Sequence, residues 1–293
     1  MTDKSISRRV FLVMNVLFFI IVSVVCLIPI IQVLSISLSS SSSVAAGKVI
    51  LLPMEPTLKS YEYILKKVEF WRAMLVSGVR VMAGVSFGML MTVLMAYPLS
   101  KPASVFRART ALMWMLLFTM LFSGGMIPSY MIVKYTGLTN NLLSLILPCS
   151  IQAFNIILLV NFFRAIPREL EESAFLDGAG HFRIMWRIYI PLSLPAIATL
   201  VVFTMVFHWN AWFDGMIYLS DARQYPLQTY LQAVLVNPNV KLITKSTAEL
   251  LRTVSDRTLK AAQVFIAAIP ICLIYPFLQR YFVAGIMLGG VKE

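Results

Sequence analysis

The 293-residue chain is 59% apolar and only 13% charged, whereas soluble domains carry about 25% charged residues. Several apolar runs reach the roughly 20 residues that a membrane-spanning helix needs, so the composition excludes a soluble globular protein and indicates an integral membrane protein. The net charge of +12 does not indicate nucleic-acid binding, because Lys and Arg are scattered through polar segments and membrane proteins keep positive loops on the cytoplasmic side.

The apolar runs predict an all-α fold in a single transmembrane domain over residues 1–293. The first run follows Lys4, Arg8 and Arg9. A cleaved signal peptide is the alternative for it, since residues 43–46 resemble a small-residue cleavage site. The apolar region of a signal peptide is only about 7–15 residues long, so a retained helix is expected instead. About six transmembrane helices are predicted, at about residues 10–34, 75–99, 111–133, 142–163, 194–219 and 261–282.

Two places along the chain interrupt this pattern. The serine run from Ser39 to Ser43 follows the first apolar run and predicts a flexible outer loop. Gly124, Gly125 and Pro128 interrupt the third apolar run. A kink within that span and a continuation toward Val133 are both compatible with the sequence.

The distribution of positive residues predicts the orientation. With the amino terminus inside, the inner segments are residues 1–9, the loop that begins at Lys101, residues 164–191 and the tail from Arg280. The outer segments also contain Lys and Arg, but the inner segments are richer per residue, and the rule concerns short loops. We therefore expect a cytoplasmic amino terminus.

The polar segment 164–191 reads as two short helices joined by a glycine turn. Pro167 suits the first position of a helix, and acidic residues in the following turns suit the positive end of the helix dipole. Asp177 and Gly178 break the chain before a second amphipathic stretch, in which Phe182, Met185, Trp186 and Tyr189 recur at helical spacing. A hairpin lying on lipid would explain the amphipathicity. A loop that docks into another protein would also explain the acidic cluster.

The spacing within this segment resembles the conserved loop of binding-protein-dependent ABC permeases, written as Glu-Ala-Ala, three residues, Gly, nine residues, Ile, any residue, Leu-Pro. This chain has Glu172-Ser173-Ala174, Gly178, Ile188 and Ile190-Pro191, and departs at Ser173 and Ile190. Leu52-Pro53 with Pro56-Thr57-Leu58, Trp209-Asn210 and Tyr225-Pro226-Leu227 resemble the smaller permease of carbohydrate importers. The ending 285–292 resembles a subgroup that serves oligosaccharides or polysaccharides. Within that group the chain is similar to the second permease of alginate and related uronate importers.

The resemblance implies a set of partners. It implies a second, homologous permease with which the chain encloses the pathway, two ATPases that bind ATP and Mg, and an extracytoplasmic solute-binding protein. The chain itself would be a non-catalytic subunit without a cofactor, in the lipid of the bacterial inner membrane, with a carbohydrate as substrate. No Gly-x-x-x-x-Gly-Lys-Ser/Thr motif occurs in the sequence.

The resemblance also implies that segment 164–191 is a cytoplasmic coupling loop between the fourth and fifth spans. Glu172 would be its charged anchor on the ATPase, and Ala174 and Ala179 would be small enough for close docking. Asp177 and Gly178 would shape the turn. Closure of the ATPases would rock the permeases in alternating access. The predicted coupling residues are Glu172, Ser173, Ala174, Asp177, Gly178 and Ala179.

A carbohydrate pathway needs polar and aromatic side chains, and polar groups within a membrane face protein or water. The alternatives are that Asn and Gln bridge helices and that Trp marks the membrane interface. His208 is expected to be a hydrogen-bonded packing residue rather than a ligand. The candidates are Gln152, Asn155 and Asn161 in the fourth span, and His208, Trp209, Asn210, Trp212 and Asp214 in the fifth.

Other functions fit the sequence less well. An ion-gradient-driven secondary transporter usually has ionisable groups at mid-membrane, and here Asp214 is nearly alone and near an outer end. A membrane enzyme has little support, because the chain has only two histidines and its cysteines show no metal-ligand spacing. Each of the three cysteines lies in an apolar run. The basic outer loops would suit either an acidic polysaccharide or an acidic binding protein, but they equally suit an unselected surface.

Overall fold

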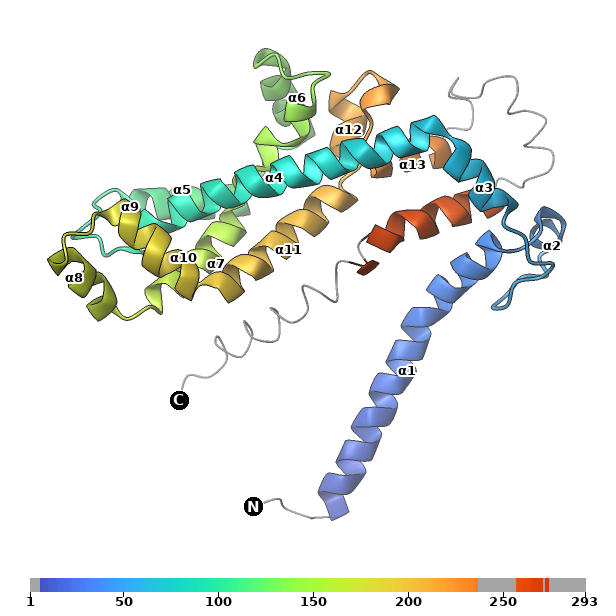
Figure 1. Ribbon diagram of the computed structural model, residues 1–293, viewed down its shortest axis with the longest axis horizontal. Helices are drawn as coiled ribbons and strands as arrows, with labels where there is room; N and C mark the ends of the chain where they lie inside the picture. The colour runs from blue at the N-terminus through green and yellow to red at the C-terminus, as the bar shows by residue number, and fades with distance from the viewer. Residues whose placement is uncertain (1–5, 237–256, 271, 274–293) are drawn as a thin grey trace. The chain divides into compact units, whose positions relative to one another are not determined.

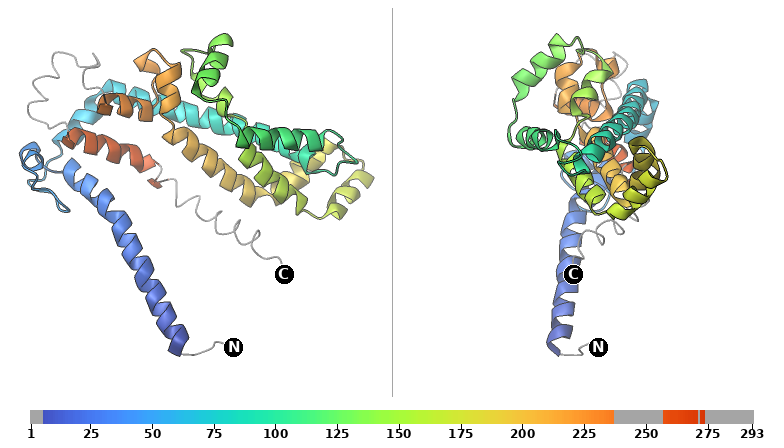
Figure 2. Two further views of the ribbon diagram at one scale, coloured as in Figure 1. Left: turned by 180° about the vertical axis from the view of Figure 1, so that it is seen from behind. Right: turned by 90° about the vertical axis from the view of Figure 1, so that its left-hand side faces the viewer.

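The computed structural model describes residues 6–236, 257–270, 272 and 273. These residues form helices and turns without a strand, which confirms the predicted helical class. By its internal contacts the chain divides into two compact units, residues 1–70 with 234–269 and residues 71–233 with 270–293. Each unit is described by itself below; Figure 1 labels the helices, and Figure 2 gives two further views in the same colours.

The first unit contains three helices near the amino terminus and one late helix. They are α1 (Ile6–Ser37), α2 (Ser41–Ala45) and α3 (Lys59–Lys66), and a helix over 257–270. The serine run, expected to be a flexible loop, instead forms α2 and a hydrogen-bonded turn around Glu55. Ser40 and Ser43 donate to Glu55 Oε2 at 2.5 and 3.1 Å. These hydroxyls, with Ser40 contributing most, lower the pKa of Glu55.

The second unit is built around α4 (Val68–Ser100), nearly all of which belongs to it. The elements that follow along the chain are α5 (Arg109–Leu121), α6 (Met126–Tyr135), the 3₁₀ turns Leu142–Leu145 and Leu147–Cys149, α7 (Ala153–Arg164), α8 (Arg168–Leu176), α9 (His181–Ile184), the π turn Met185–Tyr189, α10 (Ile190–Leu192), α11 (Leu194–Asn210), α12 (Phe213–Tyr218), the 3₁₀ turn Ala222–Gln224 and α13 (Leu227–Val236).

The predicted spans do not all form straight helices. Among the described residues, only Arg8–Ser37 within α1 and Val68–Ser100 are single helices long and apolar enough to cross a membrane. Three bent pairs qualify if each counts as one span: α5 with α6, residues 142–149 with α7, and residues 181–192 with α11, bent by 119°, 45° and 82°. The described residues thus hold two to five candidate spans, whereas the sequence predicted about six. The predicted sixth span, 261–282, lies partly outside the described residues.

Local chemistry accounts for these bends. Between α5 and α6 the chain passes through Gly125 at φ +83°, a conformation that a side chain disfavours, so the predicted span 111–133 breaks rather than continuing straight. Pro148 lies in the 3₁₀ turns before α7, and Pro195 lies in the first turn of α11. A proline cannot donate a backbone hydrogen bond, which favours helix starts and breaks at these positions.

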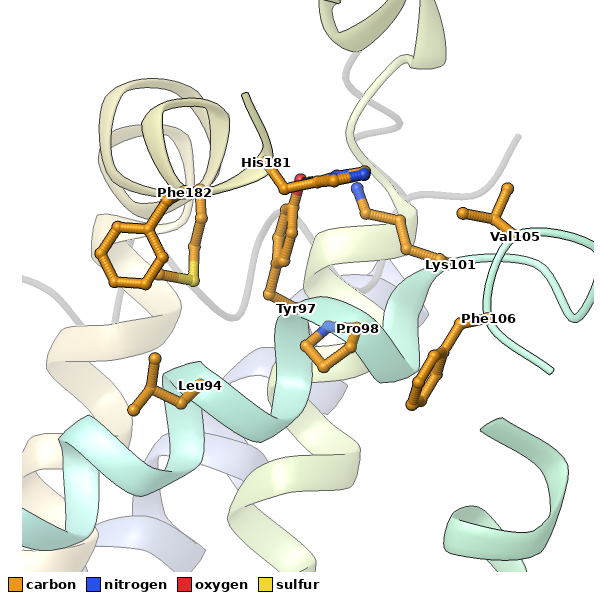
Figure 3. A pocket seen from close by; sticks show the side chains of 9 residues that line it. Leu94, Tyr97, Pro98, Lys101, Val105, Phe106, His181 and Phe182 are labelled. Carbon is orange, nitrogen blue, oxygen red and sulfur yellow. Dashed lines mark hydrogen bonds between the residues drawn. The ribbon is translucent and has the colours of Figure 1, made fainter. Parts of the chain in front are cut away.

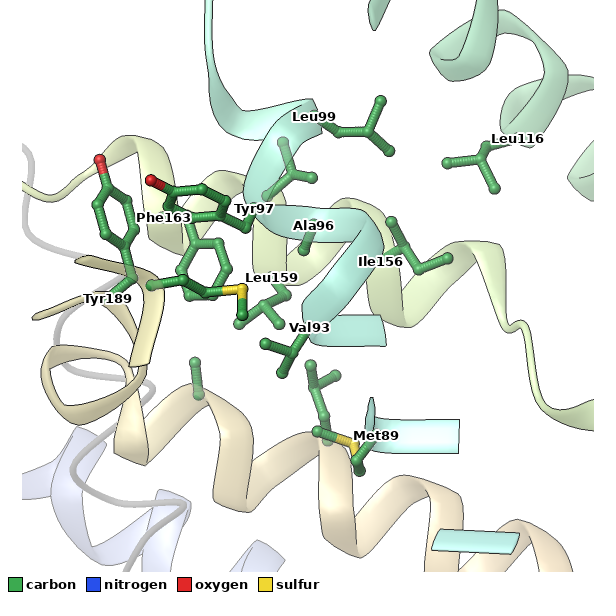
Figure 4. Close-up of a cluster of buried hydrophobic side chains, with 14 of the residues drawn as sticks. Met89, Val93, Ala96, Tyr97, Leu99, Leu116, Ile156, Leu159, Phe163 and Tyr189 are labelled. Atoms are coloured by element: carbon green, nitrogen blue, oxygen red, sulfur yellow. The ribbon is translucent and has the colours of Figure 1, made fainter. Parts of the chain in front are cut away.

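The core of the second unit lies where α4, α7 and α11 meet (Figure 4). Met89, Val93 and Ala96 of α4 pack with Ile156 and Leu159 of α7 and with Leu200 of α11. Between membrane helices, close packing rather than the hydrophobic effect stabilises such contacts. The partly buried Ala174 and Ala179 pack against this cluster, so it reaches the predicted coupling loop.

Two glycines let α4 approach its neighbours closely. A Cβ on Gly84 would lie 2.4 Å from Nε2 of His208 in α11, and a Cβ on Gly88 would lie 3.4 Å from the carbonyl oxygen of Ser150. Small residues four apart on a helix face are typical of close packing between membrane helices. Gly84 and Gly88 therefore set the distance between α4 and the elements on that face.

Candidate functional site

The predicted coupling loop folds as α8, a tight turn and α9. Gly178 has φ +77°, and the backbone N–H of Ala179 donates to the carbonyl of Ala174 at 2.9 Å. A residue with positive φ after a helix satisfies its last carbonyl groups, and glycine adopts this conformation without strain. The turn at Asp177 and Gly178 thus has the conformation that their residue types favour.

The predicted coupling residues differ in exposure. Glu172, Ser173, Asp177 and Gly178 are exposed. Ala174 and Ala179 are partly buried against the core, so their small size has a reason within this chain. Beside them, Leu176 is 90% exposed. The turn therefore presents an acidic side chain and a large apolar side chain together.

The second half of the loop does not have one uniform apolar face. Met185 and Tyr189 are buried, whereas Phe182 and Trp186 are 67% and 48% exposed. The segment Met185–Tyr189 is a π turn, whose wider winding changes the direction of side chains relative to an α-helix. These four residues, which recur at helical spacing in the sequence, therefore form a buried pair and an exposed pair.

The structure places a buried polar cluster beneath the loop that the sequence did not reveal. Lys101, just after α4, has its Nζ 2.6 Å from Oε1 of Glu171 in α8, and the Tyr189 hydroxyl donates to Oε2 of Glu171 at 2.6 Å. Lys101 Nζ also lies 4.1 and 4.0 Å from the ring centres of Tyr97 and Tyr189, at cation–π distance. We call Lys101, Glu171 and Tyr189 the loop anchor.

The electrostatics of the loop anchor favour a charged Glu171. Burial of Glu171 opposes ionisation, but the hydrogen bonds from Lys101 and Tyr189 outweigh burial and hold the pKa of Glu171 below its ordinary value. In the sequence, Glu171 was one of several acids suited to a helix start. What distinguishes Glu171 from the other acids is its contact with Lys101, the lysine directly after the second apolar run. The sequence alone does not show that these two residues meet.

A cavity of about 330 Å³ lies between the end of α4 and α9 (Figure 3). Leu94, Phe106 and Phe182 contribute to its apolar lining, and Lys101 and His181 stand at one end. The Tyr97 hydroxyl lies 3.2 Å from Nδ1 of His181, which joins α4 to the first residue of α9. Both halves of the predicted coupling loop are thus bonded to the end of α4.

In the predicted fourth span, Asn155 bridges helices. Its Nδ2 donates to Oε1 of Gln152 at 2.9 Å and to Oγ1 of Thr204 in α11 at 3.1 Å, and Asn155 is 3% exposed. This arrangement matches the helix-bridging alternative. Gln152 retains a buried Nε2 without a partner among the described residues. Asn161 is exposed.

In the predicted fifth span, His208 and Trp209 are buried at 1% and 9% exposure. His208 packs over Gly84 as expected of a packing residue, but neither ring nitrogen has a hydrogen-bond partner among the described residues. Asn210 is exposed and Trp212 is 39% exposed. Asn210 and Trp212 are therefore the exposed members of this group.

The sequence suggested that Asp214 is nearly alone as an ionisable group in the membrane, but the structure gives it a charged partner. Its carboxylate forms a two-pronged ion pair with Arg80 of α4, whose side chain is fully buried. Arg80 also donates to the carbonyl of Ala211 at 3.1 Å, where α11 ends. In the sequence, Arg80 stands out as a single cation inside an apolar run. A bidentate Arg–carboxylate pair fixes geometry strongly, so Asp214 holds the break between α11 and α12 instead of standing free for a ligand.

Known proteins resemble the chain over nearly its whole length. The family described as "Binding-protein-dependent transport system inner membrane component" matches residues 3–287. The polygalacturonan/rhamnogalacturonan transport system permease protein YtcP of Bacillus subtilis is 38% identical, covering 94% of this chain and 96% of the relative. Protein LplC of Bacillus subtilis is 37% identical, covering 98% and 96%.

A solved structure agrees. A chain of a bacterial ABC transporter involved in the import of the acidic polysaccharide alginate matches with a TM-score of 0.88 and 34% identity, covering 96% of this chain and 100% of that chain. The resemblance that the loop motif predicted is therefore confirmed. The chain belongs to the family of inner membrane components of binding-protein-dependent transport systems.

Proposed function

We propose that the chain is a permease subunit of an ATP-driven importer of acidic oligosaccharides or polysaccharides. The observation that carries the proposal is the agreement between two full-length similarities, to a polygalacturonan/rhamnogalacturonan permease and to an alginate importer. Polygalacturonan and alginate are both polymers of uronic acids. A carboxylate-bearing sugar chain is therefore the substrate class.

The partners follow from the family. A second, homologous permease completes the pathway, two ATPases bind ATP and Mg, and an extracytoplasmic solute-binding protein delivers the sugar. The chain lies in the inner membrane with its amino terminus and coupling loop in the cytoplasm. The secondary-transporter alternative gains no support, because Asp214, the residue that would carry its ion, is paired with Arg80.

The exposed turn of the coupling loop supports docking to an ATPase. Glu172 offers a charge and Leu176 offers an apolar anchor on the same short helix, and interfaces combine such groups. The loop anchor and the contacts of Ala174 and Ala179 hold this turn against the core. Force applied to the turn would therefore reach α4 directly.

Asn210 and Trp212 are the residues that we assign to the sugar pathway. They lie at the end of α11, exposed, with the backbone around them held by the Arg80–Asp214 pair. An indole face and an amide suit the rings and hydroxyl groups of a sugar. Asn155 and Asp214 have structural partners instead.

Co-purification followed by ATP hydrolysis tests the function. The tagged chain is isolated from its native membrane, and hydrolysis is measured with its binding protein and with oligogalacturonate, alginate oligosaccharide or neutral maltodextrin. We expect an ATPase and a second permease to co-purify, and hydrolysis to rise with an acidic oligosaccharide but not with maltodextrin. Stimulation by maltodextrin alone would contradict the substrate class, and recovery of the chain without any ATPase would contradict the function.

Glu172→Lys tests the coupling role, with Glu169→Lys as the matched control. Both acids are exposed on α8, but only Glu172 is in the family motif. We expect Glu172→Lys to insert normally while losing most ATPase association and sugar-stimulated hydrolysis, and Glu169→Lys to retain both. Full stimulation in the Glu172→Lys complex would refute the coupling role.

A further inference from the structure

A second cavity of about 330 Å³ in the same unit has a strongly basic lining. It lies between the end of α4, the start of α5, the end of α7 and the start of α8. Among its described lining residues, the charged side chains are Lys101, Arg109, Arg164, Arg168 and Glu171. We call this cavity the basic pocket.

The single carboxylate of the basic pocket is already occupied. Glu171 accepts hydrogen bonds from both Lys101 and Tyr189. Within the described part of the chain, no ion pair joins Arg109, Arg164 or Arg168 to any carboxylate. The basic pocket therefore has three guanidinium charges that no carboxylate of the described residues neutralises.

Two of these arginines converge on one point. Arg109 Nε and Arg164 Nη2 each donate to the carbonyl oxygen of Leu99, both at 3.2 Å. Two like charges that share one neutral acceptor repel each other, and a bound anion would offset this repulsion. Leu99 lies in the last turn of α4, where a carbonyl without a helical partner accepts hydrogen bonds from cationic side chains, so the two arginines also cap α4.

The position of the basic pocket indicates which anion it takes. One terminus of each of three apolar helices lies there: α4 ends at Ser100, α5 begins at Arg109 and α7 ends at Arg164. The ends of membrane-spanning helices lie at the level of the lipid headgroups, where anionic lipids attract Arg and Lys. Guanidinium groups also match the oxygens of a phosphate ester in fork-like geometry.

We propose that the basic pocket binds the phosphate group of an anionic phospholipid at the cytoplasmic membrane surface. The proposal rests on the membrane location in the proposed function, but not on the sugar or on the ATPases. Arg168 is the first residue of α8, so a bound headgroup touches the helix that carries Glu172. The lipid would thereby help to hold the coupling loop in place.

Lipid binding to the full complex tests the proposal. The complex is reconstituted in phosphatidylcholine vesicles with increasing phosphatidylglycerol, and tightly bound lipid is measured by native mass spectrometry. We expect saturable phosphatidylglycerol binding to the wild-type complex. Each of Arg109→Gln and Arg164→Gln should weaken it about fivefold, the loss expected for one cationic contact near a membrane surface.

Arg107→Gln is the matched control, because Arg107 is exposed in the same loop but does not line the basic pocket. Equal weakening by Arg107→Gln would overturn the proposal. Non-saturable binding to the wild type would overturn it without requiring any variant to fold. Inorganic phosphate added to the vesicles that contain phosphatidylglycerol separates the two sources of the anion. Displacement of phosphatidylglycerol by phosphate supports the phosphate site, and tight phosphate binding without any lipid binding overturns the lipid assignment. Loss of sugar stimulation with lipid binding intact would contradict the proposed function but not this site.

Discussion

At the scale of single residues, two acids of α8 differ in what surrounds them. Glu171 and Glu172 are neighbours in sequence with opposite surroundings: Glu171 is paired with Lys101 beneath the loop, and Glu172 is exposed. In the proposed function the exposed Glu172 would meet the ATPase, whereas Glu171 holds the loop to the end of α4. The two acids therefore separate docking from support.

Glu171→Gln should destabilise the second unit, because Lys101 keeps its charge in a site with little access to water. Breaking a buried pair by removing one partner costs about 3–5 kcal/mol, and the slight exposure of Glu171 places this pair at the lower end. Thermal unfolding of the purified complex measures the loss, with Glu169→Gln as the exposed control on the same helix. The double variant Lys101→Met with Glu171→Leu should recover part of the lost stability. An unfolding temperature equal to wild type in Glu171→Gln would rule out the loop anchor.

The same pair predicts a response to acid. The pKa of folded Glu171 lies below its ordinary value of 4.5, so its stabilising contribution is complete above that value. As the pH falls below 4.5 toward the lower folded pKa, Glu171 takes up a proton and the contribution is lost. The stability difference between wild type and Glu171→Gln should therefore shrink in this range. A difference that stays constant down to acid unfolding would contradict the assignment.

At the scale of elements, α4 connects the two polar clusters of the second unit. Arg80 and Ser100 are separated along α4 by about 30 Å at the helical rise, with the Asp214 pair at one end and the loop anchor just beyond the other. Gly84 and Gly88 hold α11 and the Ser150 backbone against the helix between them. In the proposed function, the helix is thus placed to transmit movement of the coupling loop to the end of α11.

Gly84→Ala tests the close packing of α4 on α11. Its methyl group would lie 2.4 Å from the His208 ring, and overpacking typically costs about 1–3 kcal/mol. Gly78→Ala in the same helix is the control, because nothing lies within 4 Å of a Cβ there. Thermal unfolding should show destabilisation at Gly84 only, and Gly84→Ala with His208→Ala should restore stability. Equal behaviour of the two glycines would show that the packing is looser than described.

The Arg80–Asp214 pair separates a structural role from a substrate role. Asp214→Asn should lower the unfolding temperature, because Arg80 is fully buried and loses its partner. Replacing both residues with Met and Leu should recover much of the stability. A change in sugar selectivity without any loss of stability would instead place Asp214 in the sugar pathway.

At the scale of the whole molecule, the topology follows from the proposed function. The coupling loop must face the cytoplasm to meet an ATPase, and the region around Lys48 must face the outside to meet a binding protein. Both Asp177 and Lys48 are exposed. Side-specific labelling can therefore test the orientation directly.

In a variant whose Cys26, Cys149 and Cys272 are replaced by Ser, Lys48→Cys should react with a membrane-impermeant maleimide in intact spheroplasts. Asp177→Cys should react only after the membrane is opened. Labelling of both positions from the same side would contradict the predicted topology. Labelling of neither after permeabilisation would show that both positions are covered by partners, and stripping the ATPases should then expose Asp177→Cys.

The sequence by itself determined the membrane class, the helical fold and the family, because these depend on composition, apolar periodicity and motif spacing within short segments. It also located the loop turn, since Asp177 and Gly178 favour that conformation locally. Only the tertiary structure decided where the apolar runs bend and which polar residues meet. Lys101 and Glu171 are 70 residues apart, and Arg80 and Asp214 are 134 apart. Such contacts depend on how helices pack side by side, which no local pattern encodes.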